Sequence, residues 1–154
     1  MKKDLSILNV DTEKQRLGRF GERAAARYLF RHGYLIRRMN YVWGKNEIDI
    51  IATKGDTAAF VEVKTRSVEK MSPRERRPAS SVTAKKQRGI MRTAAHYAAW
   101  HTRNKKRRFD IIEVYVKTEN GGKTVADIRH LINTYNVHTA FGVPVYDAYL
   151  EEDE

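Results

Sequence analysis

The chain has 154 residues, of which 41% are hydrophobic, and this size and composition suit one compact domain. Two Trp, eight Tyr and five Phe exclude a chain that is disordered throughout, and the lack of cysteine excludes disulfides, thiolate metal sites and a thiol nucleophile. Lys and Arg number 30 against 19 Asp and Glu, which gives a net charge of +11. No apolar stretch approaches the roughly 18 residues of a membrane span, and residues 1–10 are too polar for a signal peptide. We therefore expect a cytoplasmic protein.

The first predicted element is a helix over residues 12–32. Thr12 with Gln15 three residues later resembles a capping box, and Gly33 is a natural C-terminal stop for the helix. Apolar residues at helical spacing form the face expected to be buried. Another face carries a basic ridge at every fourth position, made of Arg19, Arg23, Arg27 and Arg31.

Extended segments follow at residues 34–41, 47–53 and 58–66, joined by short turns, and predict an antiparallel meander. A polar loop over 67–81 leads to a second helix at 82–101, a basic loop at 102–107 and two further strands at 108–117 and 123–131. The order helix, three strands, helix, two strands predicts an α/β fold with a mixed five-stranded sheet flanked by helices. We expect one domain over residues 1–135 and a C-terminal tail over 136–154.

The positive charge is concentrated in one segment. Residues 64–108 contain fifteen Lys or Arg and two acids, Glu69 and Glu75, for a local net charge of +13. Such a concentration attracts a polyanion, either nucleic acid or an anionic membrane surface. The alternative is that the charge serves solubility alone.

Two carboxylates stand where strand interiors are expected to be apolar. Asp49 lies between two isoleucines and Glu62 between two valines, with Lys64 on the same strand face as Glu62. Acids in such positions are seldom buried unless they are paired or bind a metal. The pattern predicts a metal site between two strands. The alternative is a salt bridge of Asp49 or Glu62 with Lys64.

Oxygen ligands of this kind favour Mg²⁺ or Mn²⁺ and phosphodiester cleavage. Asp49 and Glu62 would bind the ion, and Lys64 would orient or deprotonate the water nucleophile. Glu22, the one acid on the arginine-rich helix, is a candidate third carboxylate at the metal. Its alternative role is a helical ion pair with Arg19 or Arg23.

The second helix supplies further candidates. Lys86 and Gln87 continue its apolar lines and are expected to point toward the sheet, either at the site or as the snorkelling ends of an amphipathic helix. Phosphate contacts are expected from the surrounding basic side chains, which are Lys85, Lys86, Arg88, Arg66, Arg19 and Arg23.

Several of these residues together resemble the YraN family of bacterial proteins. The resemblance covers roughly residues 14–116 and is carried by Gly21-Glu22, Asn40, Glu47-Ile48-Asp49, Phe60-Val61-Glu62-Val63-Lys64, Lys86-Gln87 and Arg108-Phe109-Asp110. It implies a restriction-endonuclease-like (PD-(D/E)xK) fold close to that of Holliday-junction resolvases. It also implies that Glu22, Asp49, Glu62 and Lys64 occupy catalytic positions and that Lys86 or Gln87 is the auxiliary helix residue. Asn46 departs from the glycine usual before Glu-Ile-Asp.

The resulting hypothesis is a Mg²⁺-dependent endonuclease that cleaves structured or branched DNA, with Gln87 in the catalytic set. A non-catalytic nucleic-acid-binding adaptor with the same fold is the alternative. A membrane-surface binder is the weakest hypothesis, because no basic amphipathic helix with a bulky aromatic face is visible. Resolvase-like folds often pair two active sites across a dimer, so a homodimer is among the expected assemblies.

Overall fold

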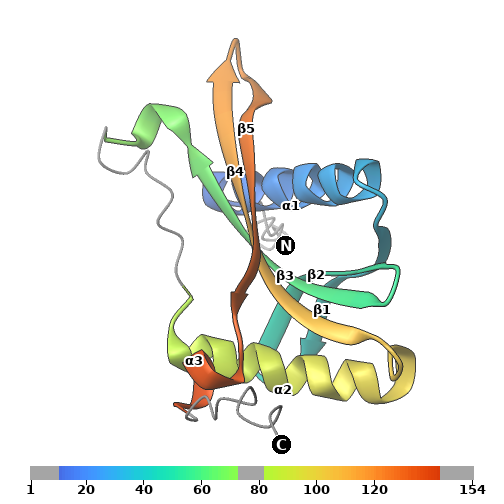
Figure 1. Cartoon of the computed structure of the whole chain (residues 1–154). Coiled ribbons are helices and arrows are strands. Elements are labelled where there is room, and N and C mark those ends of the chain that lie inside the picture. Colours follow the sequence, from blue (N-terminus) through green and yellow to red (C-terminus); the bar gives the residue numbers. More distant parts are fainter. Residues whose placement is uncertain (1–10, 73–81, 143–154) are drawn as a thin grey trace, which may run out of the picture.

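The computed structural model describes residues 11–72 and 82–142 of the chain (Figure 1). The helices are α1 (Glu13–Arg31), the short 3-10 helix η1 (Val68–Lys70), α2 (Ala84–His101) and α3 (Val137–Phe141). The strands are β1 (Leu35–Trp43), β2 (Asn46–Lys54), β3 (Thr57–Ser67), β4 (Lys106–Glu119) and β5 (Gly122–Tyr135).

The five strands form one sheet in the order β1-β2-β3-β4-β5. Short turns make the β1–β2, β2–β3 and β4–β5 pairs antiparallel. The β3–β4 pair is parallel, because the chain crosses from one strand to the other through α2. The predicted α/β domain with a mixed five-stranded sheet and flanking helices is therefore confirmed.

The two long helices cover opposite faces of the sheet (Figure 1). The capping box predicted for α1 is present, because the Thr12 hydroxyl accepts from the backbone N–H of Gln15 and the Gln15 side chain accepts from the backbone N–H of Thr12. On the α1 side the core includes Ala25, Leu29, Ile50, Val61, Ile112 and Val114. On the α2 side it includes Ile48, Phe60, Ile90, Ala94, Tyr97 and Ile111. Burial of both sheet faces explains why β2, β3 and β4 are almost continuously apolar.

The segment expected to be a tail begins with structure. Asn136 caps α3, and Ala140 is buried in the core on the α2 side. A helix of five residues is too short to show helical periodicity, so no pattern in the sequence indicated it. Residues 73–81 of the expected polar loop and residues 143–154 lie outside the described part of the chain. The boundary at residue 135 stays a prediction.

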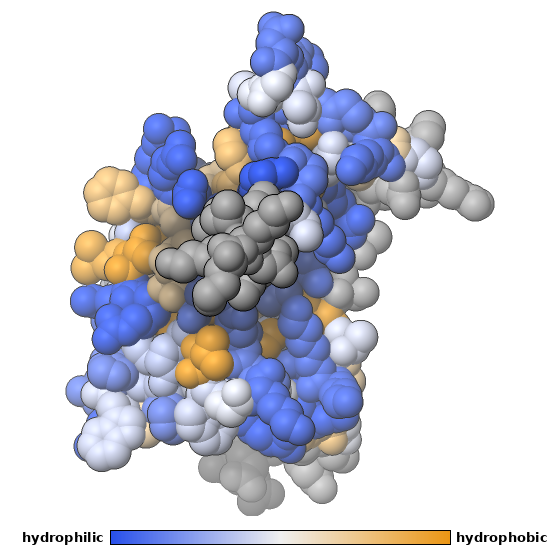
Figure 2. All heavy atoms as spheres, turned by 180° about the vertical axis from the view of Figure 1, so that it is seen from behind, coloured by the Kyte–Doolittle hydropathy of each residue, from blue (hydrophilic) through white to orange (hydrophobic). Residues whose placement is uncertain are grey.

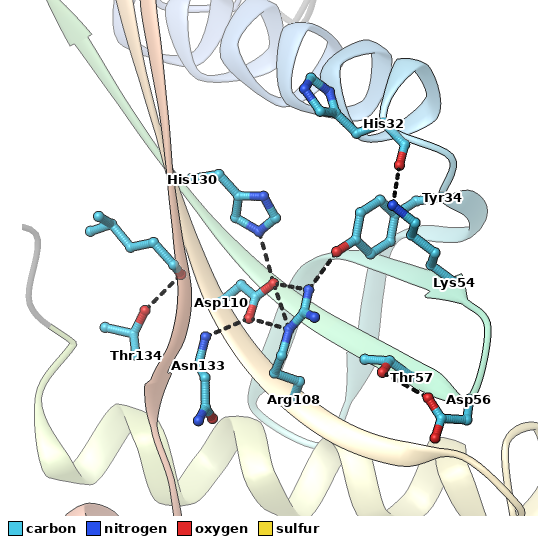
Figure 3. Close-up of polar contacts among 11 residues, drawn as sticks. His32, Tyr34, Lys54, Asp56, Thr57, Arg108, Asp110, His130, Asn133 and Thr134 are labelled. Atoms are coloured by element: carbon cyan, nitrogen blue, oxygen red, sulfur yellow. Dashed lines mark hydrogen bonds and ion pairs between the residues drawn. The ribbon is translucent and has the colours of Figure 1, made fainter.

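A buried polar cluster joins the sheet to the end of α1 (Figure 3). Asp110 is fully buried and accepts hydrogen bonds from Arg108, from His130 and from the backbone N–H of Asn133. The guanidinium of Arg108 also donates to the hydroxyl of Tyr34 over 2.7 Å. Burial alone would raise the pKa of Asp110, but the hydrogen bonds from His130, Arg108 and Asn133 outweigh it and hold the pKa below its ordinary value. The cluster thus connects β5 to β4 where the register of their pairing shifts, between Phe109 and Ile111.

The face of the molecule drawn in Figure 2 is mostly hydrophilic. On the face seen in Figure 2 hydrophobic residues occur in small groups among hydrophilic ones. Across the described residues no helix combines the length and hydrophobicity needed to cross a membrane.

Candidate functional site

The site begins where β2 and β3 stop pairing. Their ladder runs from Lys54↔Thr57 to Ile50↔Val61 and ends there, although both strands continue. Beyond that point the carboxylate of Asp49 accepts a hydrogen bond from the backbone N–H of Val63 over 2.7 Å. The side chain thus satisfies a donor that the ladder leaves open. This hydrogen bond fixes Asp49 beside Glu62.

Glu62 is held by two lysines. Its side chain lies on the α2 side of β3, two residues after the core residue Phe60, and the residue is only 6% exposed. The ammonium of Lys86 on α2 forms an ion pair with Glu62 Oε1. Lys64 Nζ lies 3.5 Å from the same oxygen. Glu62 and Lys64 therefore share a strand face, and their ion pair is the salt bridge named above as the alternative to a metal site. Lys86 points toward the sheet, as expected for either of its two roles.

The two carboxylates affect each other. Burial, followed by the charge of Glu62, raises the pKa of Asp49 to about 7, and Glu22 contributes in the same direction. The Val63 N–H and the Lys86 charge act against this shift. A carboxyl buried next to a second carboxylate favours a bound proton or a bound cation. The site therefore has the electrostatics of a cation-binding position.

Glu22 on α1 is connected to Glu47 through the side-chain amide of Asn40. The side-chain amide of Asn40 donates to Glu22 over 3.0 Å and to Glu47 over 2.9 Å. Asn40 has a positive φ of 51°, which asparagine tolerates better than most residues. Sequence reasoning did not assign a site role to Asn40 or Glu47. The available signal was that Glu47 shares a strand face with Asp49.

The acidic group opens onto a cleft of about 550 Å³ between the sheet and the start of α2. The sheet side is lined by Lys45, Asn46, Glu47, Asp49 and Glu62, and the helix side by Thr83, Lys85, Lys86, Gly89, Ile90 and Arg92. The two walls approach closely at Gly89, where a Cβ atom would lie 2.2 Å from Asn46 Oδ1. The acids therefore lie on the sheet side of the cleft, and the cations lie on both sides, with Lys45 beside the acids and Lys85, Lys86 and Arg92 on the helix.

Some predicted residues are engaged elsewhere. The amide of Gln87 donates to the Val82 carbonyl over 2.7 Å and accepts from Thr139 over 3.0 Å, so it holds α3 rather than facing the carboxylates. Arg88 donates to the Ala140 carbonyl at the end of α3. Both residues were expected at the site or on phosphates, and the unforeseen helix α3 explains the difference.

The remaining basic candidates divide between the two faces of the sheet. Arg19 pairs with Asp11 and Arg23 is exposed, both on α1 across the sheet from the cleft. Arg66 follows Lys64 on the same face of β3 and is half-buried. Lys85 and Lys86 are the predicted phosphate contacts that the structure places in the cleft.

The donor set fits a hard divalent cation. Asp49 and Glu62 offer carboxylate oxygens, and Mg²⁺ characteristically binds one or two carboxylates while keeping water and phosphate ligands. Within residues 11–72 and 82–142 no group of three or more His, Cys, Asp or Glu side chains is arranged to hold a metal. Glu22 is thus joined to the site through Asn40 rather than grouped with Asp49 and Glu62 as a third ligand.

Comparison with known proteins identifies the family. The profile of the "Uncharacterised protein family UPF0102" matches residues 21–114, which include Glu22, Asp49, Glu62, Lys64 and Lys86. The chain belongs to the UPF0102 family. A UPF0102 protein of Caldicellulosiruptor bescii is 41% identical over 108 residues, which is 69% of this chain and 87% of that protein. A UPF0102 protein of Chlorobium phaeobacteroides is 44% identical over 111 residues, covering 71% and 84%. The resemblance to the YraN family is thereby confirmed.

Proposed function

We propose that this UPF0102 protein is a Mg²⁺- or Mn²⁺-dependent nuclease that cleaves phosphodiester bonds in structured or branched DNA. The observation that carries the proposal is the convergence of Asp49 and Glu62 at the point where β2 and β3 separate, with Lys64 3.5 Å from Glu62. A divalent cation bound there would polarise the phosphoryl oxygen and lower the pKa of a bound water.

The residues of the chain have separate tasks in this proposal. Asp49 and Glu62 hold the cation, and the Val63 N–H fixes the orientation of Asp49. Lys64 lies 3.5 Å from the same oxygen of Glu62 and would orient the attacking water as a hydrogen-bond donor. Lys86 neutralises Glu62 in the metal-free protein and donates to a phosphate when the cation takes its place at Glu62.

Exposed basic residues of the cleft bind the other phosphates of the nucleic acid. Lys45, Lys85 and Arg92 line the cleft and are exposed, so their charges are available to phosphates. A homodimer with two such clefts stays compatible with this arrangement. Gln87 and Arg88 take structural roles at α3 and are no longer part of the proposed catalytic and phosphate-binding sets.

One observation favours a second candidate function. The ion pair between Lys86 and Glu62 lets the acidic site exist without a metal, as in a non-catalytic adaptor that binds nucleic acid. A nuclease needs Asp49 for cleavage. An adaptor binds nucleic acid whether or not Asp49 is present.

A cleavage assay separates them. Labelled four-way junction, flap, single-stranded and duplex DNA are incubated with the protein and Mg²⁺ or Mn²⁺. We expect at least one substrate to be cut, and Asp49→Asn and Glu62→Gln to reduce the rate by at least about a hundredfold. Glu69→Gln, an exposed acid near the β3 end, is the matched control and should cut normally. Binding without cleavage of any substrate, unchanged in Asp49→Asn, would favour the adaptor.

A further inference from the structure

The rim of the cleft carries an aromatic pair that the proposed chemistry does not use. The rings of Trp43 on β1 and His96 on α2 are nearly parallel, with centroids 4.6 Å apart and planes inclined by 16°. The hydroxyl of Tyr41 and His96 Nδ1 form a hydrogen bond of 2.9 Å, which fixes the imidazole ring. Trp43 is nevertheless 41% exposed and His96 is exposed. The packing therefore leaves a large part of this aromatic surface open to solvent.

The Trp43–His96 pair lies next to the residues that line the cleft. Positions 85, 89, 92 and 96 are spaced four, three and four residues apart and so lie along one face of α2, and the first three line the cleft. On the opposite wall Trp43 is paired in register with Asn46, which lines the cleft together with Lys45. The aromatic surface therefore adjoins the cationic part of the cleft, where a phosphate backbone would lie.

Exposed aromatic rings next to exposed cations suit one class of ligand. Single-stranded nucleic acid is bound by stacking its bases on aromatic side chains while basic residues hold its backbone. Bases inside a duplex already stack on each other and offer no free face. A role in packing alone would favour burial of the indole rather than the 41% exposure observed.

We infer that Trp43 and His96 form a stacking shelf for one unpaired nucleobase, with the adjoining backbone on Lys45, Lys85 and Arg92. The inference rests on the proposed function and specifies its substrate class, a nucleic acid with an unpaired nucleotide beside the bond that is cut. The shelf is a binding feature, so its test does not require cleavage.

Fluorescence tests the shelf directly, because Trp43 and Trp100 are the two tryptophans of the chain. Trp100→Phe leaves Trp43 as the only tryptophan, and this variant is titrated in EDTA at low salt with oligothymidylate, with an abasic oligomer of equal length, and with a duplex. We expect oligothymidylate to quench Trp43 emission and the abasic oligomer and the duplex to leave it unchanged.

Affinities provide the second measurement. Trp43→Ala is expected to weaken oligothymidylate binding roughly tenfold while leaving binding of the abasic oligomer unchanged. Phe30→Ala removes another exposed aromatic side chain, on α1 across the sheet, and should change neither affinity. If Trp43→Ala folds poorly, His96→Ala and the emission of Trp43 in Trp100→Phe carry the test.

The outcomes distinguish the shelf from the proposed function. Three results would overturn the shelf and leave the nuclease proposal standing. They are Trp43 emission that oligothymidylate does not change, equal affinity for thymidylate and abasic oligomers, and quenching by the duplex equal to that by oligothymidylate. Failure of every oligomer to bind at low salt would overturn both. Quenching by oligothymidylate alone supports the shelf, whether or not any substrate is cleaved.

Discussion

Asp49 combines a structural and a chemical role in one side chain. Its carboxylate accepts the Val63 N–H at the end of the β2–β3 ladder, and it lies close enough to Glu62 for that charge to raise its pKa. The sequence identified it because a carboxylate between two isoleucines is unusual in a buried strand. The same reasoning found Glu62 and Lys64. It failed for Gln87, because the partner that takes its amide, Thr139, lies in a helix with no visible sequence pattern.

The raised pKa of Asp49 predicts how its replacement affects stability. The folded protein retains this proton up to pH about 7, whereas the unfolded chain loses it near pH 4. The folded state thus binds more protons between these values, and the contribution of Asp49 to stability falls as the pH rises. Without metal, Asp49→Asn should therefore increase the free energy of unfolding at pH 7.5 by about 1–3 kcal/mol, with the difference vanishing near pH 4.

Urea denaturation of both proteins in EDTA, at several pH values, measures this difference. Asp56→Asn, at an exposed position in the β2–β3 turn, is the control and should show no such pH dependence. A variant Asp49→Asn that is less stable than the parent at pH 7.5 would contradict the account of the site.

At the scale of elements, α1 approaches the sheet closely beside the site. Gly21 is buried, and a Cβ atom there would lie 1.8 Å from Thr65 Oγ1 on β3. Glu22 follows immediately, and Lys64 precedes Thr65 on the strand. This contact therefore sets the distance between α1 and the part of β3 that carries Lys64. No pattern in the sequence indicated this contact, because the close approach of Gly21 to the Thr65 side chain depends on packing across 44 positions of sequence.

Two glycines of α1 form a matched pair for testing this contact. Gly21→Ala should destabilise the protein by about 1–3 kcal/mol, because the added methyl group forces α1 and β3 apart. Gly18 has no atom within 4 Å of its Cβ position, so Gly18→Ala should stabilise the helix by about 0.5–1 kcal/mol. Thermal or urea unfolding of both variants checks the signs. Equal effects of the two substitutions would show that the close contact at Thr65 is wrong.

The elements themselves were largely predictable. Both long helices, the antiparallel meander and the final hairpin follow from capping residues, periodicity and turn dipeptides, and their bounds agree within a few residues. The parallel β3–β4 pairing follows from a helix that connects two strands. The strands extend further than predicted because pairing continues past their apolar residues, as in β4 and β5.

In the whole molecule, with its net charge of +11, the basic side chains differ in whether they make contacts within the protein or are exposed along the cleft. Arg88, Arg108 and Lys105 are occupied by contacts within the protein. Lys45, Lys85 and Arg92 remain exposed along the cleft. Composition alone predicted an anionic partner, and the structure identifies which cations face the acidic site.

Salt dependence tests this division of charge. The logarithm of affinity for DNA should fall linearly with the logarithm of salt concentration, and Lys85→Gln should make the slope shallower by about one unit, because one phosphate contact is lost. Lys117→Gln, near the tip of the β4–β5 hairpin away from α2 (Figure 1), should leave the slope unchanged. Fluorescence anisotropy at several salt concentrations gives both slopes. A larger change for Lys117→Gln would place the binding surface elsewhere.

The central claim is that Asp49 and Glu62 together hold one divalent cation. Anomalous scattering from crystals soaked in Mn²⁺ tests it most directly, because the signal locates the ion without assumptions about substrate. We expect a peak within coordination distance of both carboxylates, with the Lys86 ammonium displaced from Glu62, and loss of that peak in Asp49→Asn. Soaked crystals in which Lys86 still pairs with Glu62 and no manganese lies between Asp49 and Glu62 would contradict it.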